Sequence, residues 1–348
     1  MRTTLLVILL PFLFCPVVVS TPIYNVTDLG SFGGPYCYNY AWGINDARQV
    51  VGSSMLPNQL RPHAFLWQNG IMQDLGTLGG VASEARNLNR YGQVVGASHT
   101  YFGDRKAFMW DSGMMTELAG IDSVDSAAYD INDQRQVVGS YWTAGGETHA
   151  FLWDNGVVED LGTLGGGYAV AYAINESGQI VGESRTTNGE KHAFLWDRDT
   201  MMVDLDIPGD TYGCAYDIND NGQVVGEALP GGVSESPFLW QQGVTKFLET
   251  SDGGSGVAYS VNDSGLIAGS SNRMACVWES GEEVCIGNLP QATGIPRAIN
   301  NLGQIVGYSG TQGGDVYATL WQPVPEPSTV LAFGAGLVGL FLLRRRRT

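Results

Sequence analysis

Tryptophan recurs in this 348-residue chain at an almost constant interval. Seven tryptophans end variants of one phrase, His-Ala-Phe-Leu-Trp, and the steps between them are 43, 43, 43, 44, 38 and 43 residues. They are Trp67, Trp110, Trp153, Trp196, Trp240, Trp278 and Trp321. A repeat of this length is one supersecondary unit, which buries its apolar surface against its neighbours. The period therefore predicts a repeat architecture of seven units.

A second phrase keeps step with the first. It reads Ile-Asn-Asp followed by Gln-Val-Val-Gly, and its asparagines are Asn45, Asn89, Asn132, Asn175, Asn219, Asn262 and Asn300. The spacing from asparagine to tryptophan is 21 or 22 residues in six units but only 16 in the sixth. The change in length is therefore confined to one connection of the sixth unit.

Each unit carries the local signals of four short strands. Segments such as 215–219 (AYDIN), Gln-Val-Val-Gly, His-Ala-Phe-Leu-Trp and 156–161 (GVVEDL) are compatible with strands, and pairs such as Asn69-Gly70 indicate tight turns. Four strands in about 43 residues is the size of a propeller blade. We therefore predict an all-β fold, a seven-bladed β-propeller of four-stranded blades.

The two ends of the repeat region complement each other. Residues 23–34 (IYNVTDLGSFGG) match a fourth strand with its glycine-rich exit, whereas no fourth strand follows Trp321. If the N-terminal strand completes the last blade, residues 21–322 form a closed ring without a free sheet edge. The alternative is an open β-solenoid, for which atypical capping units at both ends are typical.

The chain is strongly acidic, with 18 basic against 35 acidic residues and a formal net charge of −17. Five basic residues, Arg2 and Arg344 to Arg347, lie at the extreme ends, so the body of the chain is more acidic still. Such a surface repels phosphate backbones and argues against a nucleic-acid partner. Solubility outside the cell explains the acidity most simply, and binding of a cation or basic ligand is the alternative.

Residues 1–20 (MRTTLLVILLPFLFCPVVVS) have the pattern of a secretory signal peptide. Arg2 is followed by an apolar stretch from Leu5 to Val19, and a small residue, Ser20, follows. We expect cleavage near Ser20, and the alternative is an uncleaved membrane anchor. The repeat domain is in either case expected outside the cytoplasm.

The C-terminal end has three parts in a fixed order. They are a linker, 323–328, with Pro325, Glu326 and Pro327; an apolar segment, 329–343; and a tail, 344–348, with Arg344, Arg345, Arg346 and Arg347. The apolar segment is short for a membrane span, but snorkelling arginines can extend it. We expect one transmembrane helix with the arginines on the cytoplasmic side.

This tail resembles the PEP-CTERM sorting signal of Gram-negative bacteria. The resemblance covers only about 25 residues, with all three parts in order. It implies recognition by a membrane protease of the exosortase type, possible release from the helix, and an association with exopolysaccharide or biofilm production. A plain C-terminal membrane anchor is the alternative.

The repeated phrases resemble the HAF-repeat extracellular proteins of bacteria. The match to His-Ala-Phe is specific in the first, third and fourth units and weaker in the fifth to seventh. The resemblance implies an extracellular protein and carries no catalytic residues over to this chain.

Two patterns invite a metal hypothesis. His63, His149 and His192 occupy one position of the phrase, but one histidine per blade is too widely spaced to share an ion, so we interpret them as structural. Residues 217–222 (DINDNG) resemble the start of a calcium loop but lack the acidic twelfth residue, which is Ala228. A hairpin turn is the favoured interpretation, and we expect no catalytic residue, metal site or cofactor.

Cys276 and Cys285 flank a predicted turn at Ser280-Gly281. Pairing the strands around this turn sets the two cysteines opposite each other, and an oxidising compartment permits a disulfide between them. We expect no bond between Cys37 and Cys214, because they lie in distant blades.

The loops between the second and third strands vary most in chemistry. We expect them on the same face as the glycine-rich connections between blades, and we expect that face to hold any ligand site. Tyr101, Phe102, Tyr141 and Trp142 lie in or beside these loops. They could stack on sugars, although packing between blades is the favoured interpretation.

The leading functional hypothesis is a non-catalytic surface or matrix-binding protein whose ligands are glycans or neighbouring proteins. The alternative is an extracellular propeller enzyme, a polysaccharide lyase or hydrolase. A cluster of acidic, histidine or tyrosine residues that occurs only once, at the channel mouth, would favour the enzyme. The identity of the ligand does not follow from the sequence.

Overall fold

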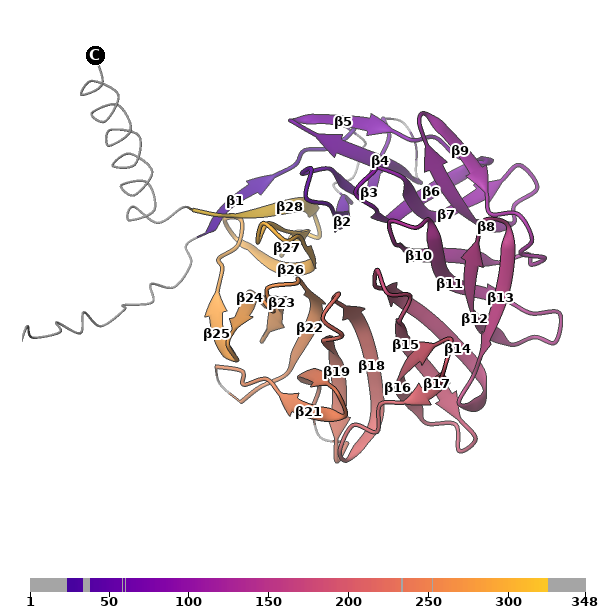
Figure 1. The fold of residues 1–348 in the computed structure, drawn as a ribbon. Helices are drawn as coiled ribbons and strands as arrows, with labels where there is room; N and C mark the ends of the chain where they lie inside the picture. The colour runs from indigo at the N-terminus through magenta and orange to yellow at the C-terminus, as the bar shows by residue number, and fades with distance from the viewer. Residues whose placement is uncertain are drawn as a thin grey trace, which may run out of the picture.

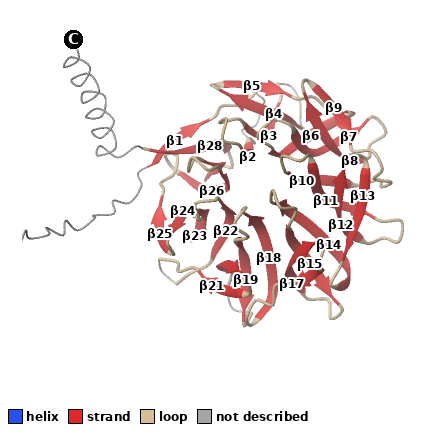
Figure 2. Cartoon of the chain, in the orientation of Figure 1, coloured by secondary structure: helices blue, strands red, loops and turns tan. Residues whose placement is uncertain are grey.

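The computed structural model describes residues 24–33, 38–57, 59, 61–232, 234–251 and 253–324. In these ranges the chain is all β, with 28 strands and no helix (Figure 2). None of the described segments is a helix that could cross a membrane. The predicted signal peptide (1–20), sorting motif (325–327), transmembrane helix (329–343) and arginine tail (344–347) lie outside the described residues.

Consecutive strands pair into antiparallel units of four. Three units along the chain are separate sheets. They are β2 (Tyr40–Ile44), β3 (Val50–Met55), β4 (Pro62–Gln68) and β5 (Ile71–Asp74); β6 (Gly79–Leu88), β7 (Val94–Thr100), β8 (Arg105–Asp111) and β9 (Met114–Glu117); and β22 (Gly256–Val261), β23 (Ile267–Ser271), β24 (Met274–Glu279) and β25 (Glu282–Cys285).

A twelve-stranded sheet contains three further units of the same kind. They are β10 (Ser126–Ile131), β11 (Gln136–Trp142), β12 (Thr148–Asp154) and β13 (Val157–Gly162); β14 (Gly165–Ile174), β15 (Ile180–Thr186), β16 (Lys191–Asp197) and β17 (Met201–Asp204); and β18 (Asp210–Ile218), β19 (Val224–Pro230), β20 (Ser236–Gln241) and β21 (Val244–Phe247). Single parallel pairs, Thr148 with Tyr168 and Lys191 with Tyr212, join them.

The remaining sheet combines the two ends of the described chain. Strands β26 (Ala292–Ile299), β27 (Ile305–Thr311) and β28 (Val316–Pro323) pair in order, and β1 (Tyr24–Asp28) is the fourth strand. β1 runs antiparallel to β28 with five residue pairs, from Tyr24–Pro323 to Asp28–Thr319. The N-terminal strand thus covers the edge that β28 would otherwise expose.

The units follow one another around a central axis, with the first strand of each unit innermost (Figure 1). Strand direction alternates, so the turns between first and second strands lie on one face, which we call the turn face. The connections between second and third strands, and those between units, lie on the opposite face, which we call the loop face.

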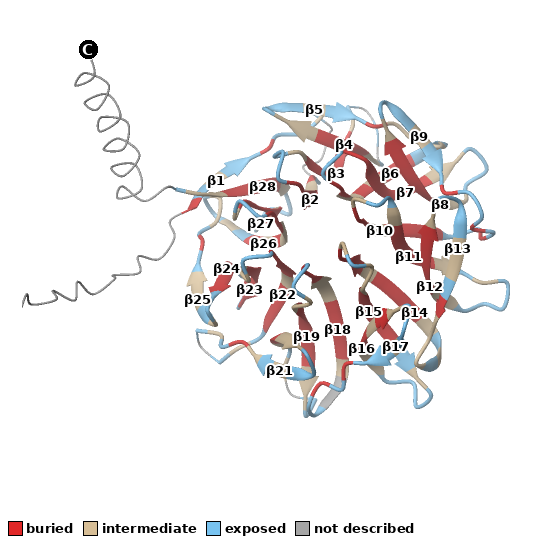
Figure 3. Ribbon diagram, in the orientation of Figure 1, coloured by how far each residue is buried: buried red, intermediate tan, exposed pale blue. Residues whose placement is uncertain are grey.

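The outer strands of the units, such as β5 and β9, are mostly exposed, whereas the inner strands are largely buried (Figure 3). The hydrophobic core lies between units rather than within them. Each hydrophobic cluster joins two neighbouring units; Val95 and Met109, for example, pack with Val137 and Phe151. One cluster joins the last unit to the first and contains Val306, Leu320 and Phe65. Buried apolar area between neighbours is therefore what holds this arrangement together.

The repeated tryptophan also links neighbours by a hydrogen bond. In three units its indole N–H donates to a carbonyl in the connection that leaves the preceding unit: Trp153 to Ala119 (3.0 Å), Trp278 to Glu249 (2.7 Å) and Trp321 to Gly287 (2.8 Å). In these three units the repeated tryptophan therefore makes the same contact with the preceding unit.

Candidate functional site

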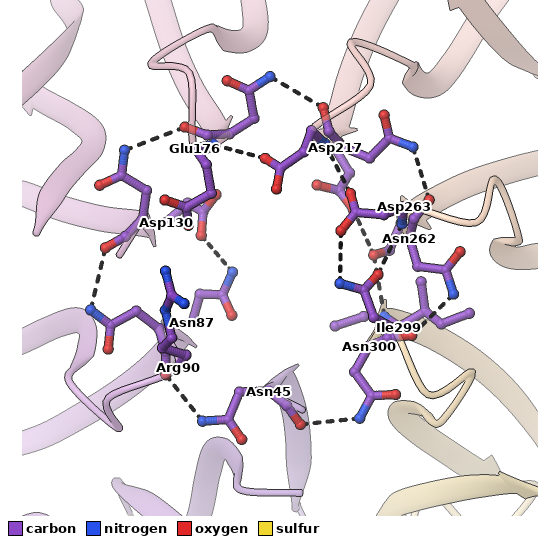
Figure 4. Close-up of a pocket in the computed structure, with 18 of the residues that line it drawn as sticks. Asn45, Asn87, Arg90, Asp130, Glu176, Asp217, Asn262, Asp263, Ile299 and Asn300 are labelled. Carbon is purple, nitrogen blue, oxygen red and sulfur yellow. Dashed lines mark hydrogen bonds between the residues drawn. The ribbon is translucent and has the colours of Figure 1, made fainter. Parts of the chain in front are cut away.

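The asparagines of the second phrase form a closed hydrogen-bonded ring on the turn face (Figure 4). Each side-chain amide donates to the backbone carbonyl of the asparagine in the next unit, over 2.8–3.3 Å. The circle closes where Asn300 donates to the Asn45 carbonyl over 3.0 Å. We call this set the asparagine ring.

Each member of the ring also holds its own turn. Asn175, for example, accepts the backbone N–H groups of Ser177 (3.1 Å) and Gln179 (2.9 Å) through Oδ1. Its amide donates a second bond to the Gln179 side chain, over 2.9 Å. Asn175 is 4% exposed and fully bonded, so its polar atoms are committed to structure.

The ring surrounds a cavity of about 240 Å³ that is rich in carboxyl groups. Most of these carboxylates accept a backbone N–H from the preceding unit: Glu176 from Asp133, Asp220 from Glu176 and Asp263 from Asp220. Among the described residues no group of His, Cys, Asp or Glu has the arrangement of a metal site. The carboxylates link the units as the asparagines do.

Two further carboxyl groups line this cavity, Asp130 being buried and Asp217 half-buried. Burial raises the pKa of Asp130 to about 7. Hydrogen bonds from the N–H groups of Ile174 and Ile131 and from the Asn87 amide stabilise the charged form and partly offset this rise. Burial likewise raises the pKa of Asp217, against hydrogen bonds from Ser260 and Val261. Asp130 and Asp217 each bond to the next unit, so they too fix the units in place.

A second ring, of aromatic and arginine side chains, lies above the asparagines. Four tyrosines contact one another edge-on or tilted, with centroids 5.3–5.8 Å apart. They are Tyr129, Tyr172, Tyr216 and Tyr259. Trp42 completes the circle between two guanidinium groups, with Arg86 4.7 Å and Arg297 5.1 Å from its ring centroid. We call this set the channel ring.

A cluster that occurs only once adjoins the channel ring. Glu183 and Glu227 are 3% and 7% exposed and follow the Val-Gly of the second strand, where other units carry Ser, Ala or Tyr. Glu183 accepts from Lys191 (2.9 Å) and from Tyr168 (2.8 Å), and Glu227 accepts from Tyr216 (2.7 Å). Burial raises the pKa of Glu227.

The sequence analysis missed this cluster. Its signal was present in the letters IVGE (180–183) and VVGE (224–227), which place a carboxyl group after the glycine in two neighbouring units only.

The three histidines of the repeated phrase bind carboxylates within their own units. His63 Nδ1 lies 3.1 Å from Asp74, His149 Nδ1 2.7 Å from Asp160, and His192 Nδ1 2.6 Å from Asp204. Lys106 and Glu117 form the same kind of pair over 3.3 Å. Because lysine can replace histidine here, the position serves a cross-strand ion pair.

Residues 217–222 comprise the last two residues of β18 and the turn that leads to β19, as the hairpin interpretation predicts. Cys276 and Cys285 lie directly opposite each other on β24 and β25, as the turn at Ser280-Gly281 requires, and both thiols are free in this structure. Cys214 is buried, and Cys37 lies outside the described residues.

The loop face exposes aromatic side chains that the sequence analysis assigned to packing. Tyr101 is 83%, Phe102 89% and Trp142 48% exposed. That interpretation is wrong for Tyr101 and Phe102, because both side chains lie in the short loop between β7 and β8 and are exposed to solvent. It holds for Tyr141, which packs against the hydrophobic cluster that joins the second and third units, and whose hydroxyl donates to Asp160 of its own unit over 3.0 Å.

These exposed rings occupy neighbouring units that polar contacts tie together. Arg105, which follows the Tyr101–Phe102 loop, binds the Asp125 carboxylate over 3.1 Å, and its N–H donates to Val124. The N–H of Trp142 donates to the Asp125 carbonyl over 2.8 Å. Val124 is itself 63% exposed. We call Tyr101, Phe102, Val124 and Trp142 the aromatic patch.

The C-terminal end matches a known sorting signal. Residues 323–347 match the family model described as the PEP-CTERM protein-sorting motif. The motif indicates export, sorting by an exosortase, and a membrane-associated or extracellular location. No curated protein matches the chain.

Solved structures share the fold. A Mycobacterium tuberculosis puromycin-hydrolyzing peptidase superposes with a TM-score of 0.59 at 10% identity, covering 86% of this chain and 56% of the peptidase. YCF48 bound to D1 peptide gives 0.53 at 8% identity, covering 88% and 99%. TolB from Acinetobacter baumannii gives 0.39 at 11% identity, covering 82% and 54%. The chain thus spans about half the length of the peptidase and of TolB. The likeness to the peptidase and to YCF48 shows a propeller-like all-β fold.

Proposed function

We propose that residues 21–322 form a closed seven-bladed β-propeller of the HAF-repeat type. The pairing of β1 with β28 supports closure, as do the asparagine ring and the cluster that joins Val306 to Phe65. A closed ring has no free sheet edge and holds its loops rigidly. Such a scaffold suits a binding module.

The propeller acts outside the cytoplasm, delivered by a signal peptide at 1–20 and held by a transmembrane helix at 329–343 until an exosortase processes the tail. The sorting motif at 323–347 supports this route. A disulfide between Cys276 and Cys285, which lie opposite each other, is compatible with an oxidising location.

The module binds glycans of the extracellular matrix without chemical turnover, and the aromatic patch carries this proposal. Rings that are 83% and 89% exposed place apolar surface in water, and a partner that covers them removes this unfavourable contact. An aromatic face can stack on the apolar face of a sugar, while nearby polar groups such as Arg105 and Asp125 bond to its hydroxyls. A role in exopolysaccharide or biofilm is the corresponding expectation.

Replacing Tyr101, Phe102 and Trp142 together by alanine is expected to weaken binding of the full-length chain to a matrix polysaccharide at least tenfold, because stacking area is lost. A glycan array followed by titration of the strongest binder measures this effect. Ile71→Ala and Val157→Ala, exposed apolar residues of outer strands, serve as controls and should leave binding unchanged. Equal loss in the controls and the patch variant would reject the patch as the binding site.

The buried Glu183 and Glu227 favour one second candidate, an extracellular enzyme that acts on polysaccharide. Two carboxyl groups in different environments are the kind of pair that general acid and base catalysis requires. Product analysis of any bound polysaccharide distinguishes the candidates. Shortened chains that disappear with Glu227→Gln would establish the enzyme and reject the non-catalytic proposal.

A further inference from the structure

The unit β22–β25 has a connection unlike those of the other units. Only Asn272 and Arg273 separate β23 from β24, and both adopt positive φ, 49° and 65°, as a tight two-residue hairpin requires. The equivalent connections of three other units span 187–190, 231–235 and 312–315. The short asparagine-to-tryptophan spacing of the sixth repeat therefore corresponds to a missing loop on the loop face.

A pocket of about 490 Å³ lies beside this hairpin. Glu235 of the preceding unit and Ile295 of the following unit form its sides. The unit itself contributes Ser255, Gly256, Val257, Tyr259, Ser270, Asn272 and Arg273. The volume falls in the range of ordinary small-ligand sites, about 300–1,000 Å³.

Backbone hydrogen bonds hold the walls of this pocket. The N–H of Asn272 donates to Ser255 over 3.0 Å, and the N–H of Gly256 donates to Glu235 over 3.1 Å. The wall is closely packed at Gly256, because a Cβ there would lie 2.9 Å from the Thr250 side chain and 3.1 Å from the Ser270 carbonyl oxygen. These contacts all lie within the chain, so the fold itself sets the shape of the pocket.

Two arginines lie at this pocket or behind its wall, and one carboxylate, Glu235, also lines it. Arg273 is exposed at the rim and makes no hydrogen bond or ion pair within the described part of the chain. Behind the wall, the Arg297 guanidinium lies 4.3 Å from the Tyr259 ring centroid, and its buried Nε has no partner. Among the described residues Arg297 forms no ion pair. Its guanidinium lies over the rings of Trp42, Tyr259 and Tyr308 and donates to the Tyr308 hydroxyl over 3.3 Å.

We propose that this pocket, the hairpin pocket, binds a sugar residue that bears a carboxylate. Arg273 pairs with the carboxylate at the rim, where a guanidinium can bind it through two parallel hydrogen bonds. The Glu235 carboxylate accepts from sugar hydroxyls, and Asn272 and Ser255 bond to the others. This inference rests on the proposed glycan binding and names the class of sugar that the module selects.

Titration of the full-length chain with glucuronic acid and with glucose, followed by NMR or calorimetry, tests the proposal. Glucuronic acid is expected to bind at least tenfold more tightly than glucose, because a charge-assisted pair adds to the hydroxyl contacts. Arg273→Gln should weaken the binding of glucuronic acid about tenfold. Arg48→Gln, which removes one exposed positive charge on the turn face, should leave it unchanged.

A graft that replaces Asn272-Arg273 with the sequence of 187–190 is expected to fill the pocket and abolish binding of the monosaccharide. Equal affinity for the two sugars, or equal loss in Arg48→Gln, would overturn the carboxylate assignment. If the chain binds an acidic polysaccharide but neither monosaccharide, the hairpin pocket is wrong and the proposed function stands. If it binds no glycan of any size, both fail.

Discussion

Asn175→Ala is expected to lower the free energy of unfolding by about 2–4 kcal/mol. The variant loses the bond to the Asn219 carbonyl (3.1 Å) and leaves the N–H groups of Ser177 and Gln179 without their acceptor. Buried polar groups left unpaired cost about 1–3 kcal/mol each. The loss should therefore exceed that of an ordinary surface asparagine.

Chemical denaturation of the full-length chain measures this effect, and Asn188→Ala provides the matched control. Asn188 lies exposed in the loop between β15 and β16, so its removal should change stability by less than about 0.5 kcal/mol. Equal denaturation midpoints for the two variants would show that the asparagine ring does not stabilise the fold.

Gly182→Ala is expected to cost about 3 kcal/mol or more, because strand β14 leaves no room for a side chain. A Cβ at this position would overlap the Val170 carbonyl oxygen and lie 2.9 Å from the Phe194 ring. The backbone of β14 would have to move, and its ladder of hydrogen bonds with β15 would be disturbed. This close approach explains the invariable glycine of the Gln-Val-Val-Gly phrase across the units.

Gly310→Ala is the control for this prediction. Gly310 lies in β27 with an ordinary φ, and no atom lies within 4 Å of a Cβ placed there. The control should be neutral or slightly stabilising, since alanine restricts the unfolded chain. A thermal scan in which both variants melt together would refute the steric account of Gly182.

The sequence predicted the strands because each unit repeats its own local signals. Turn pairs such as Asn155-Gly156 and the hydrophobic phrases define four strands per unit, and Cys276 and Cys285 face each other because the turn at Ser280-Gly281 sets the register. The offset of the phrases also predicted that the N-terminal strand pairs with β28.

Contacts between units could not be read from the sequence in the same way. The partner of the Asn45 amide lies 44 residues away in the next unit, and local patterns do not show which side chain bridges that distance. The exposure of Tyr101 and Phe102 depends on the path of the loop between β7 and β8, which local sequence patterns do not show. Glu227 departs visibly from the repeat in the sequence, but its burial and its bond to Tyr216 depend on the folded channel ring.

The central claim is that the N-terminal strand closes the ring by pairing with the last strand. Asn25 and Gln322 lie opposite each other in this pairing. Asn25→Cys combined with Gln322→Cys should therefore form a disulfide in the exported protein, detected by mass spectrometry of unreduced peptides. The account predicts this cross-link in most molecules and none when Asn25→Cys is combined with Gln312→Cys in the distant loop. Free thiols at residues 25 and 322, or equal cross-linking in both pairs, would contradict closure.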